Sequence, residues 1–241
     1  MNYITGDTHG DFRERISFCE RNRTTKEDIM IILGDAGINY HSNNGYQHLD
    51  KELKEKLEKV SITWFCIHGN HEQRPYAIDT YEEEIWHGGV VYVEREFPSI
   101  KFAKDGEIYD FGGKKCIAIG GAYSVDKWHR LISYQHNPYT PWFDNEQPSD
   151  EIKAYVEQQL EKVGWKVDYI FSHTAPKKYE PEEAFLPGID QSRVDKTTEE
   201  WLDKIEDKLN KMKYERWFLG HYHIEKEDEK IKIMYKNVAV L

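Results

Sequence analysis

The sequence predicts an α/β protein in which two β-sheets pack face to face and helices cover their outer sides. Three observations indicate this class. Short apolar, β-prone segments alternate with helical patterns over residues 1–70, closely spaced short strands with turn signals follow over 90–120, and helix–strand alternation returns after residue 148. At 241 residues the chain can form one sizeable α/β domain, so we expect residues 1–241 to be a single domain.

The first part of the chain alternates strands with helices. Strands are expected at residues 3–5, 29–33 and 62–67, and a helix at 12–21. A second helix precedes the third strand, because one helical face collects the apolar side chains of Leu49, Leu53, Leu57 and Val60. This alternation predicts parallel strands joined by right-handed crossovers.

The middle of the chain lacks this alternation of strands and helices. Short strands are expected at residues 90–93, 100–103, 107–111 and 115–120. Asp105-Gly106 and Gly112-Gly113 separate the last three, and such pairs are hairpin signals. We therefore expect antiparallel strands here that build the second sheet.

Helix signals return after a Pro-rich loop at 138–148. Pro148-Ser149 marks the start of a helix whose apolar stripe is formed by Ile152, Tyr155, Val156, Leu160 and Val163. A strand at 167–171 and a long polar loop at about 176–196 follow. Thr197-Thr198-Glu199-Glu200 has the pattern of a capping box, and its helix is expected to present Trp201, Ile205, Leu209 and Met212 to the core. A strand at 217–219 and one at 231–235, which closes the second sheet, complete the pattern.

Composition narrows the function classes. The formal net charge of −11 argues against a long nucleic-acid surface, which normally needs a basic stripe. No apolar stretch approaches the ~18 residues of a membrane span, and no signal segment precedes the first strand, so a cytoplasmic protein without membrane contact is expected. The three widely spaced cysteines imply no disulfide framework.

Five short segments place acids, amides or imidazoles directly after the apolar runs. They are Asp7-Thr8-His9, Gly34-Asp35, Gly69-Asn70-His71-Glu72, Ser172-His173 and Gly220-His221-Tyr222-His223. Loops that leave the carboxyl ends of strands meet at one edge of an open α/β sheet, so these side chains can converge. They supply seven metal-type ligands, namely Asp7, His9, Asp35, Asn70, His173, His221 and His223. Such oxygen and imidazole donors suit borderline divalent ions, and seven of them suit two ions that share a carboxylate.

In the order and content of these blocks the chain resembles the calcineurin-like metallophosphoesterases. Their pattern runs Asp-x-His, Gly-Asp, Gly-Asn-His-Asp/Glu, a lone His and Gly-His-x-His, and the matching blocks span residues 7–223. The resemblance implies that family's two-sheet fold and a dinuclear site for manganese, iron, zinc or nickel. It also implies that Asp35 bridges the ions, that Asp7, His9 and His223 complete one site, and that Asn70, His173 and His221 complete the other.

The resemblance further implies a phosphoesterase that hydrolyses its substrate through a metal-bridging hydroxide. His71, next to ligand Asn70 and without a metal of its own, is the expected general acid for the leaving alkoxide. Arg74 is expected to contact a nonbridging phosphate oxygen, as the matching arginine does in the serine/threonine phosphatase branch, although a surface salt bridge would explain it equally well. Glu72 is expected to hold a loop or a histidine without a direct role.

One departure from the family pattern bears on the substrate. The serine/threonine phosphatase branch carries a second acid and an Arg-Gly pair after the Gly-Asp block, and Gly34-Asp35-Ala36-Gly37-Ile38-Asn39 lacks both the acid and the arginine. This favours a phosphodiesterase or small-molecule phosphoesterase over a protein phosphatase. A noncatalytic metal-binding scaffold and a nuclease are further alternatives; the intact ligand set argues against the first, and the acidic composition against the second.

Two loops are candidate substrate walls. The segment that follows Gly120-Gly121, within loop 121–149, places Tyr123 and Trp128 where they could stack on a nucleotide base, and Lys127 or Arg130 where they could meet a phosphate; an ordinary capping loop is an equal alternative. The second is loop 176–196, with Lys177, Lys178, Tyr179 and Arg193. The expected partner is therefore a phosphate ester, with nucleotides among the candidates.

Overall fold

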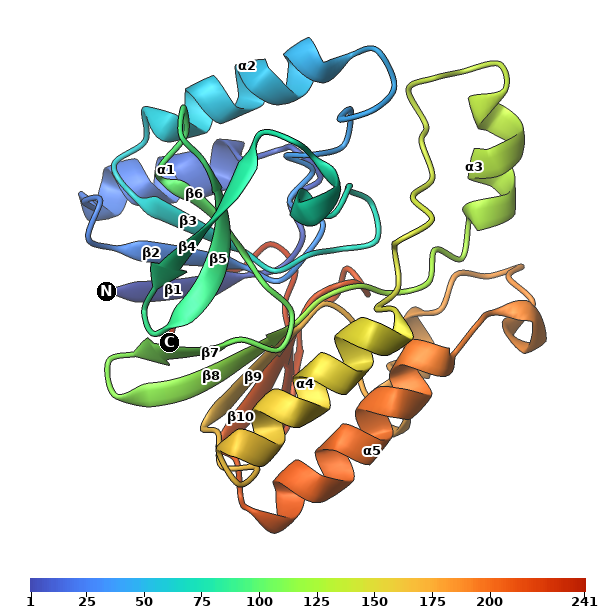
Figure 1. Cartoon of the computed structure of the whole chain (residues 1–241). Coiled ribbons are helices and arrows are strands. Elements are labelled where there is room, and N and C mark those ends of the chain that lie inside the picture. The colour runs from blue at the N-terminus through green and yellow to red at the C-terminus, as the bar shows by residue number, and fades with distance from the viewer.

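The computed structural model describes residues 1–241 and contains two mixed β-sheets flanked by five α-helices (Figure 1). The first sheet runs β13 (Ala239–Val240), β1 (Asn2–Thr5), β2 (Ile29–Ile32), β3 (Thr63–Cys66), β6 (Ile100–Ala103), β5 (Gly89–Glu94), β4 (Tyr81–Trp86). The second runs β11 (Lys226–Glu227), β12 (Ile231–Ile233), β10 (Arg216–Leu219), β9 (Tyr169–Ser172), β8 (Lys114–Ile119), β7 (Ile108–Phe111). The predicted two-sheet α/β class is confirmed.

Four of the five helices lie on the outer sides of the two sheets (Figure 1). The five are α1 (Arg13–Asn22), α2 (Gln47–Glu58), α3 (Lys127–Tyr134), α4 (Asp150–Lys162) and α5 (Thr197–Lys211). Figure 1 shows α1 and α2 over the first sheet, α4 and α5 beside the second, and α3 standing apart from both. None of these helices has both the length and the hydropathy needed to cross a bilayer.

Three buried clusters hold the layers together. The central one joins the inner faces of both sheets, with Ile31 and Phe65 from the first and Phe171 and Phe218 from the second. A second cluster packs α1 and α2 on the first sheet around Trp64, and a third packs α4 and α5 on the second sheet. Because strands β2 and β3 are buried on both faces, their sequences are continuous apolar runs rather than alternating ones.

The middle strands are distributed differently from the prediction. β5 and β6 extend the first sheet together with β4, and only β7 and β8 belong to the second sheet. Gly112-Gly113 forms the expected hairpin between β7 and β8, but Asp105-Gly106 carries the chain from one sheet to the other. The side chain of Asp105 holds this crossing by accepting a hydrogen bond from the Gly120 amide at 2.6 Å.

The remaining differences concern short or polar elements. β4, with three consecutive glutamates, was missed because its exposed sequence carries no apolar alternation, and α3 lies in a segment expected to be a loop. The edge of the second sheet is β11 rather than the predicted strand at 231–235, and β13 returns to the first sheet. Met212, expected in the core, is 41% exposed just beyond α5.

Two helix starts show one confirmed and one wrong prediction. The hydroxyl of Ser149 caps α4 by accepting a hydrogen bond from the Ile152 amide at 3.3 Å. The predicted capping box does not form at the start of α5, where Asp195 Oδ1 accepts a hydrogen bond from the Thr197 amide at 3.0 Å. Glu200, the acid of that box, pairs instead with Lys177 at 2.5 Å, and Glu199 accepts a hydrogen bond from the Thr174 hydroxyl at 2.8 Å.

Candidate metal centre

The predicted ligands lie just beyond the carboxyl ends of strands from both sheets. Asp7 and His9 follow β1, Asp35 follows β2 and Asn70 follows β3, whereas His173 follows β9, and His221 and His223 follow β10. Two hydrogen bonds tie the sheets together here. The ring of His173 contacts the Leu33 carbonyl through Nδ1 at 2.9 Å, and the His221 amide donates to Asp7 Oδ1 at 2.9 Å.

One ligand group is formed by Asp7, His9 and His223. The Nε2 atoms of the two histidines are 2.9 Å apart, and they lie 3.8 and 3.2 Å from Asp7 Oδ2. Their donor atoms are close enough together to hold a metal ion. The hydrogen bond to Asp7 raises the pKa of His223, and the ring of His223 stacks on Tyr235 at 4.7 Å.

The second group surrounds His173. Its Nε2 atom lies 2.8 Å from Asn70 Oδ1 and 3.6 Å from Asp35 Oδ1, and the ring of His221 lies 4.9 Å from the ring of His173. Burial lowers the pKa of His221 well below its ordinary value, so its imidazole is neutral at pH 7 and has a lone pair to donate.

Asp35 lies between the two groups. Its Oδ2 is 3.8 Å from His9 Nδ1 of the first group, and its Oδ1 is the oxygen near His173 of the second. Burial by itself would raise the pKa of Asp35, but the charges of His173, His71 and His9 outweigh burial and lower it. Asp35 therefore has histidine nitrogens of both groups within 4 Å, as the predicted shared ligand requires.

The electrostatics of the two acids suit cations. Asp7 and Asp35 are buried, and the ionic partners of both carboxylates are histidines rather than lysines or arginines. A buried carboxylate is costly unless a positive charge compensates it. A set of two acids, one amide and four imidazoles fits two borderline divalent ions.

The backbone at these loop positions is strained. Eight non-glycine residues have a positive φ, and four of them are predicted ligands: His9 (47°), Asp35 (46°), His221 (67°) and His223 (53°). A left-handed conformation costs an ordinary residue ~1–3 kcal/mol and persists where the surroundings enforce it. Half of the strained non-glycine residues of the chain therefore lie at the candidate metal centre.

Glycines allow the ligand loops to approach one another. A Cβ atom on Gly69 would lie 2.0 Å from Asp35 Oδ1, and one on Gly220 would lie 2.2 Å from Asp7 Oδ1. Of the four glycines that precede ligand blocks, only Gly34 has a positive φ. Gly69 and Gly220 are therefore needed for close packing against a ligand and not for a left-handed turn.

His71 lies beside the centre without belonging to either ligand group. Its backbone amide donates to Asp35 Oδ1 at 2.8 Å, and its ring Nε2 is 4.0 Å from Asp35 Oδ2. Burial lowers the pKa of the imidazole, and the charge of Asp35 opposes this effect. The nearby charges of Arg130 and Asp126, at the start of α3, also act on this imidazole.

Glu72 and Arg15 position the ligand loops. The carboxylate of Glu72 is fully buried and accepts backbone hydrogen bonds from Ala36, Gly37 and Gly69 at 3.1–3.3 Å, which ties the loop after β2 to the loop after β3. This agrees with its expected role as a loop holder. Arg15, which sequence reasoning missed, donates to the carbonyl oxygen of Asp7 at 3.1 Å. Its only sequence signal was its place in the helix after the first block.

The structure corrects the expectation for Arg74. Its guanidinium forms an ion pair with Asp105, its Nε donates to the Asn145 carbonyl at 2.8 Å, and the residue is 2% exposed. It does not line either cavity at the metal centre. A salt bridge was the stated alternative for Arg74, but Asp105 was expected only to form a turn, so neither this partner nor the burial of the pair was predicted.

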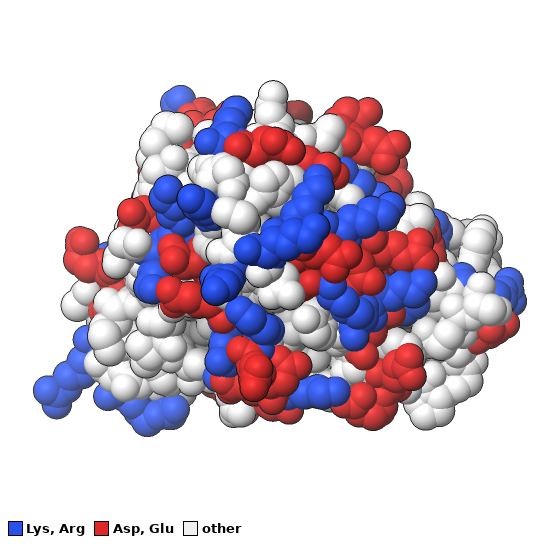
Figure 2. Space-filling model, turned by 90° about the horizontal axis from the view of Figure 1, so that it is seen from below, with Lys and Arg blue, Asp and Glu red and all other residues white.

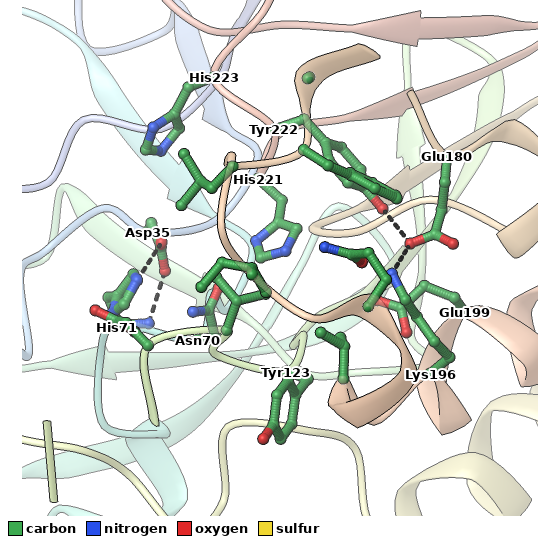
Figure 3. Close-up of a pocket in the computed structure, with 18 residues that line it drawn as sticks. Asp35, Asn70, His71, Tyr123, Glu180, Lys196, Glu199, His221, Tyr222 and His223 are labelled. Atoms are coloured by element: carbon green, nitrogen blue, oxygen red, sulfur yellow. Dashed lines mark hydrogen bonds and ion pairs between the residues drawn. The ribbon is translucent and has the colours of Figure 1, made fainter. Parts of the chain in front are cut away.

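Two cavities flank the centre, and His71 lines both. The first, about 250 Å³, also includes Asp35, Asn70 and His221 and extends beneath the segment before α5 (Figure 3). The second, about 480 Å³, lies between the loop of His9 and the chain around Tyr40, with Arg130 on its wall.

The candidate loops contribute to these walls through only some of the expected residues. Tyr123 lines the first cavity and Arg130 the second, but Trp128 is 61% exposed and Lys127 lies over the ring of Trp142 at 4.3 Å. The 176–196 segment does form a wall, built from other residues than the four predicted. Phe185, Leu186, Ile189 and Lys196 supply it.

The surface agrees with the acidic composition. Figure 2 shows basic and acidic side chains interleaved across one face of the molecule, without a broad basic area. Many of the lysines form surface ion pairs, as Lys177 does with Glu200 and Lys114 with Glu215. This face does not provide the basic stripe expected of a nucleic-acid surface.

One comparison with known proteins, with family models, agrees with the sequence pattern. A family model described as calcineurin-like phosphoesterase matches residues 3–225. Similar solved structures include a protein of unknown function from Aquifex aeolicus, with 12% identity and a TM-score of 0.42, covering 98% of this chain and 89% of that one. Another has 12% identity and a TM-score of 0.47, covering 97% of this chain and 88% of its own. No curated protein matches the chain.

Proposed function

Because the chain belongs to the calcineurin-like phosphoesterase family, we propose that it is a metal-dependent enzyme that hydrolyses a phosphodiester or another small phosphate ester at a dinuclear centre. The observation that carries this proposal is the meeting of seven ligand-type side chains from both sheets around the buried carboxylate of Asp35. The same convergence argues against a noncatalytic scaffold.

The ligand set divides around Asp35. Asp7, His9 and His223 would hold one ion, Asn70, His173 and His221 the other, and Asp35 would contact both. Two divalent ions held in this way polarise the phosphate, orient it and supply the nucleophile for hydrolysis at neutral pH. Manganese, iron, zinc and nickel all suit these donors.

His71 would deliver the proton that the reaction requires. Hydrolysis leaves an alkoxide, which departs readily only when it is protonated. The ring of His71 lines both cavities and lies next to Asp35 without being needed as a ligand. Its place supports the role of general acid, with the proton transferred to the leaving oxygen.

The two cavities favour a diester. A phosphodiester carries two organic groups, and the cavities on either side of His71 could each receive one. The serine/threonine phosphatase alternative is weakened further, because Arg74 pairs with Asp105, and Ile38 stands where that branch carries its second acid.

Hydrolysis of two nitrophenyl esters tests this proposal. With manganese-loaded protein we expect a higher kcat/KM for bis(p-nitrophenyl) phosphate than for p-nitrophenyl phosphate. A preference for the monoester would revive the phosphatase alternative. Turnover of neither ester by protein with bound metal would contradict the proposed activity on simple phosphate esters.

A further inference from the structure

The first cavity has a polar end away from the metal centre. Figure 3 shows Asp35, His71 and Asn70 on one side of the cavity and Glu180, Lys196 and Glu199 on the other. A group attached to a phosphate at the metal centre would extend toward this second set. Sequence reasoning did not identify any of these three side chains as functional.

The charge of Lys196 is already compensated. Its Nζ contacts Glu180 Oε1 at 2.5 Å and lies 4.6 Å above the ring of Phe185. Glu180 Oε1 also accepts a hydrogen bond from the Tyr222 hydroxyl at 3.4 Å. Lys196 and Glu180 therefore form a pair without net charge. This pair does not provide a binding site for an anion.

One carboxylate oxygen of Glu199 has no hydrogen-bond partner. The residue is 4% exposed, and its Oε1 accepts the hydrogen bond from Thr174, but its Oε2 is buried and has no hydrogen-bond partner. Buried polar atoms are nearly always paired, so an unpaired oxygen on a residue that lines a cavity points to a missing donor. Burial raises the pKa of Glu199 to about 7, so at pH 8 it is mainly a carboxylate that accepts hydrogen bonds.

The walls of the cavity are apolar and partly aromatic. The rings of Phe185 and Tyr222 are roughly parallel, with an interplanar angle of 28° and centroids 6.5 Å apart, and Tyr123 lies on the opposite wall. Flat heterocycles stack on such surfaces. The volume of about 250 Å³ lies near the lower end of small-molecule sites, which suits one ring system better than a larger group.

We propose that this cavity binds the base of a nucleotide ester and that Glu199 Oε2 accepts a hydrogen bond from an exocyclic amino group on that base. The proposal rests on the proposed function, since the metal centre would hold the phosphate. It predicts selection for adenine or cytosine over hypoxanthine or uracil, which carry a carbonyl oxygen in place of the amino group.

Equilibrium binding to manganese-loaded protein at pH 8 tests the proposal with matched ligands. AMP and IMP differ at position 6 of the ring and in the proton that IMP carries on N1, and CMP and UMP differ at position 4 and in the proton that UMP carries on N3. In at least one pair we expect the amino form to bind about tenfold more tightly, because the carbonyl form leaves Oε2 unpaired and repels it.

Two substitutions assign the preference to Glu199. Glu199→Gln keeps an acceptor for Thr174 and should reduce the amino preference; Glu199→Leu offers no acceptor in either orientation and should abolish it. Glu206→Gln is the matched control, because Glu206 is a buried glutamate on the same helix that contacts Tyr214 and Lys178 away from the cavity. It should keep the wild-type ratio.

The outcomes separate this proposal from the proposed function. Equal affinities within both pairs, or a preference that survives Glu199→Leu, would overturn the assignment of the cavity even if the protein hydrolyses bis(p-nitrophenyl) phosphate. A Glu199-dependent preference in a protein that hydrolyses no ester would support the cavity and contradict the enzyme activity.

Discussion

At the scale of single residues, the site depends on buried acids surrounded by imidazoles. Asp35 lies within 4.0 Å of ring nitrogens of His9, His71 and His173. Four ligands keep a left-handed backbone that costs stability, and such strain persists only where other contacts enforce it. The hydrogen bonds of Glu72 and Arg15 provide part of that enforcement.

His71→Gln tests the general acid. Glutamine preserves the backbone contact with Asp35 but cannot transfer a proton at this step. We expect kcat to fall by ~10²- to 10⁴-fold for an alkyl ester and much less for a nitrophenyl ester, whose leaving group needs no proton. Steady-state kinetics on the two esters, with metal content measured in parallel, give the comparison. Unchanged turnover of the alkyl ester would show that His71 is not the acid.

The ligands could be predicted from sequence because each belongs to a short local pattern at the end of a strand. Side-chain contacts between segments that are distant in the sequence could not be predicted. Arg74 meets Asp105 because β3 and β6 are neighbours in the first sheet, and Glu199 meets Thr174 because α5 packs against the second sheet. Glu199 carried one usable signal, since it lies on the buried side of α5 with Leu202 and Leu209, where a glutamate is unusual.

At the scale of secondary-structure elements, parallel strands bring the ligand loops to one edge. Long apolar strands and strongly amphipathic helices were predictable, because burial on both faces or on one stripe leaves a clear pattern. The sequence did not predict which sheet each middle strand joins. A turn signal does not show whether the chain turns back within one sheet or crosses to the other. The crossing from the first sheet to the second is held by the hydrogen bond between Asp105 and the Gly120 amide.

The close approach of two loops predicts the effect of Gly220→Ala. The added methyl group would overlap Asp7 Oδ1, so the loop after β10 must move away from the loop after β1. We expect metal affinity to fall by at least tenfold, since changes to residues that hold metal ligands in place commonly cost about 10–100-fold. Isothermal titration with manganese measures it.

Gly45→Ala serves as the control for losing a glycine. Its φ is +87°, but its Cβ would meet nothing within 4 Å, so it should lower stability without changing metal affinity. Equal metal affinity in Gly220→Ala and the wild type would contradict the packing argument.

α2 carries a buried acid that predicts a pH effect. Asp50 accepts the His41 amide at 2.9 and 3.1 Å, and burial raises its pKa to about 7. The folded state therefore binds more protons than the unfolded state between pH ~4 and ~7, so this residue makes stability fall as the pH rises through that range. A difference of one in pKa between the folded and unfolded states changes the free energy of unfolding by ~1.4 kcal/mol.

Asp50→Asn should remove that contribution. Urea unfolding of metal-free protein at pH 5 and pH 8 should show a smaller loss of stability in Asp50→Asn than in the wild type. An identical pH dependence in the two proteins would show that Asp50 titrates normally in the folded state.

At the scale of the whole molecule, the two sheets share one apolar core while the ligands span both. The central cluster takes residues from the strands of each sheet, and Asp7 and His221 are joined across them. We propose that residues 1–241 form a single domain, and that neither sheet would remain folded without the other.

Thermal unfolding tests the single domain. The metal-free chain should unfold in one transition, with far-ultraviolet circular dichroism and tryptophan fluorescence giving the same midpoint. Buried Trp64 reports on the first sheet and buried Trp217 on the second, so variants in which one of these is the sole tryptophan of the seven can compare the halves. Separate midpoints for the two reporters would contradict a shared core.

The central claim is that Asp35 joins two metal sites and that activity depends on them. The most direct measurement determines manganese stoichiometry and bis(p-nitrophenyl) phosphate hydrolysis for metal-stripped protein after manganese is added back, in the wild type and in Asp35→Asn. Asp11→Asn, which changes an exposed aspartate paired with Arg13, is the control. We predict two ions per chain and restored hydrolysis in the wild type and the control, with loss of both in Asp35→Asn. Two bound ions and full activity in Asp35→Asn would contradict the account.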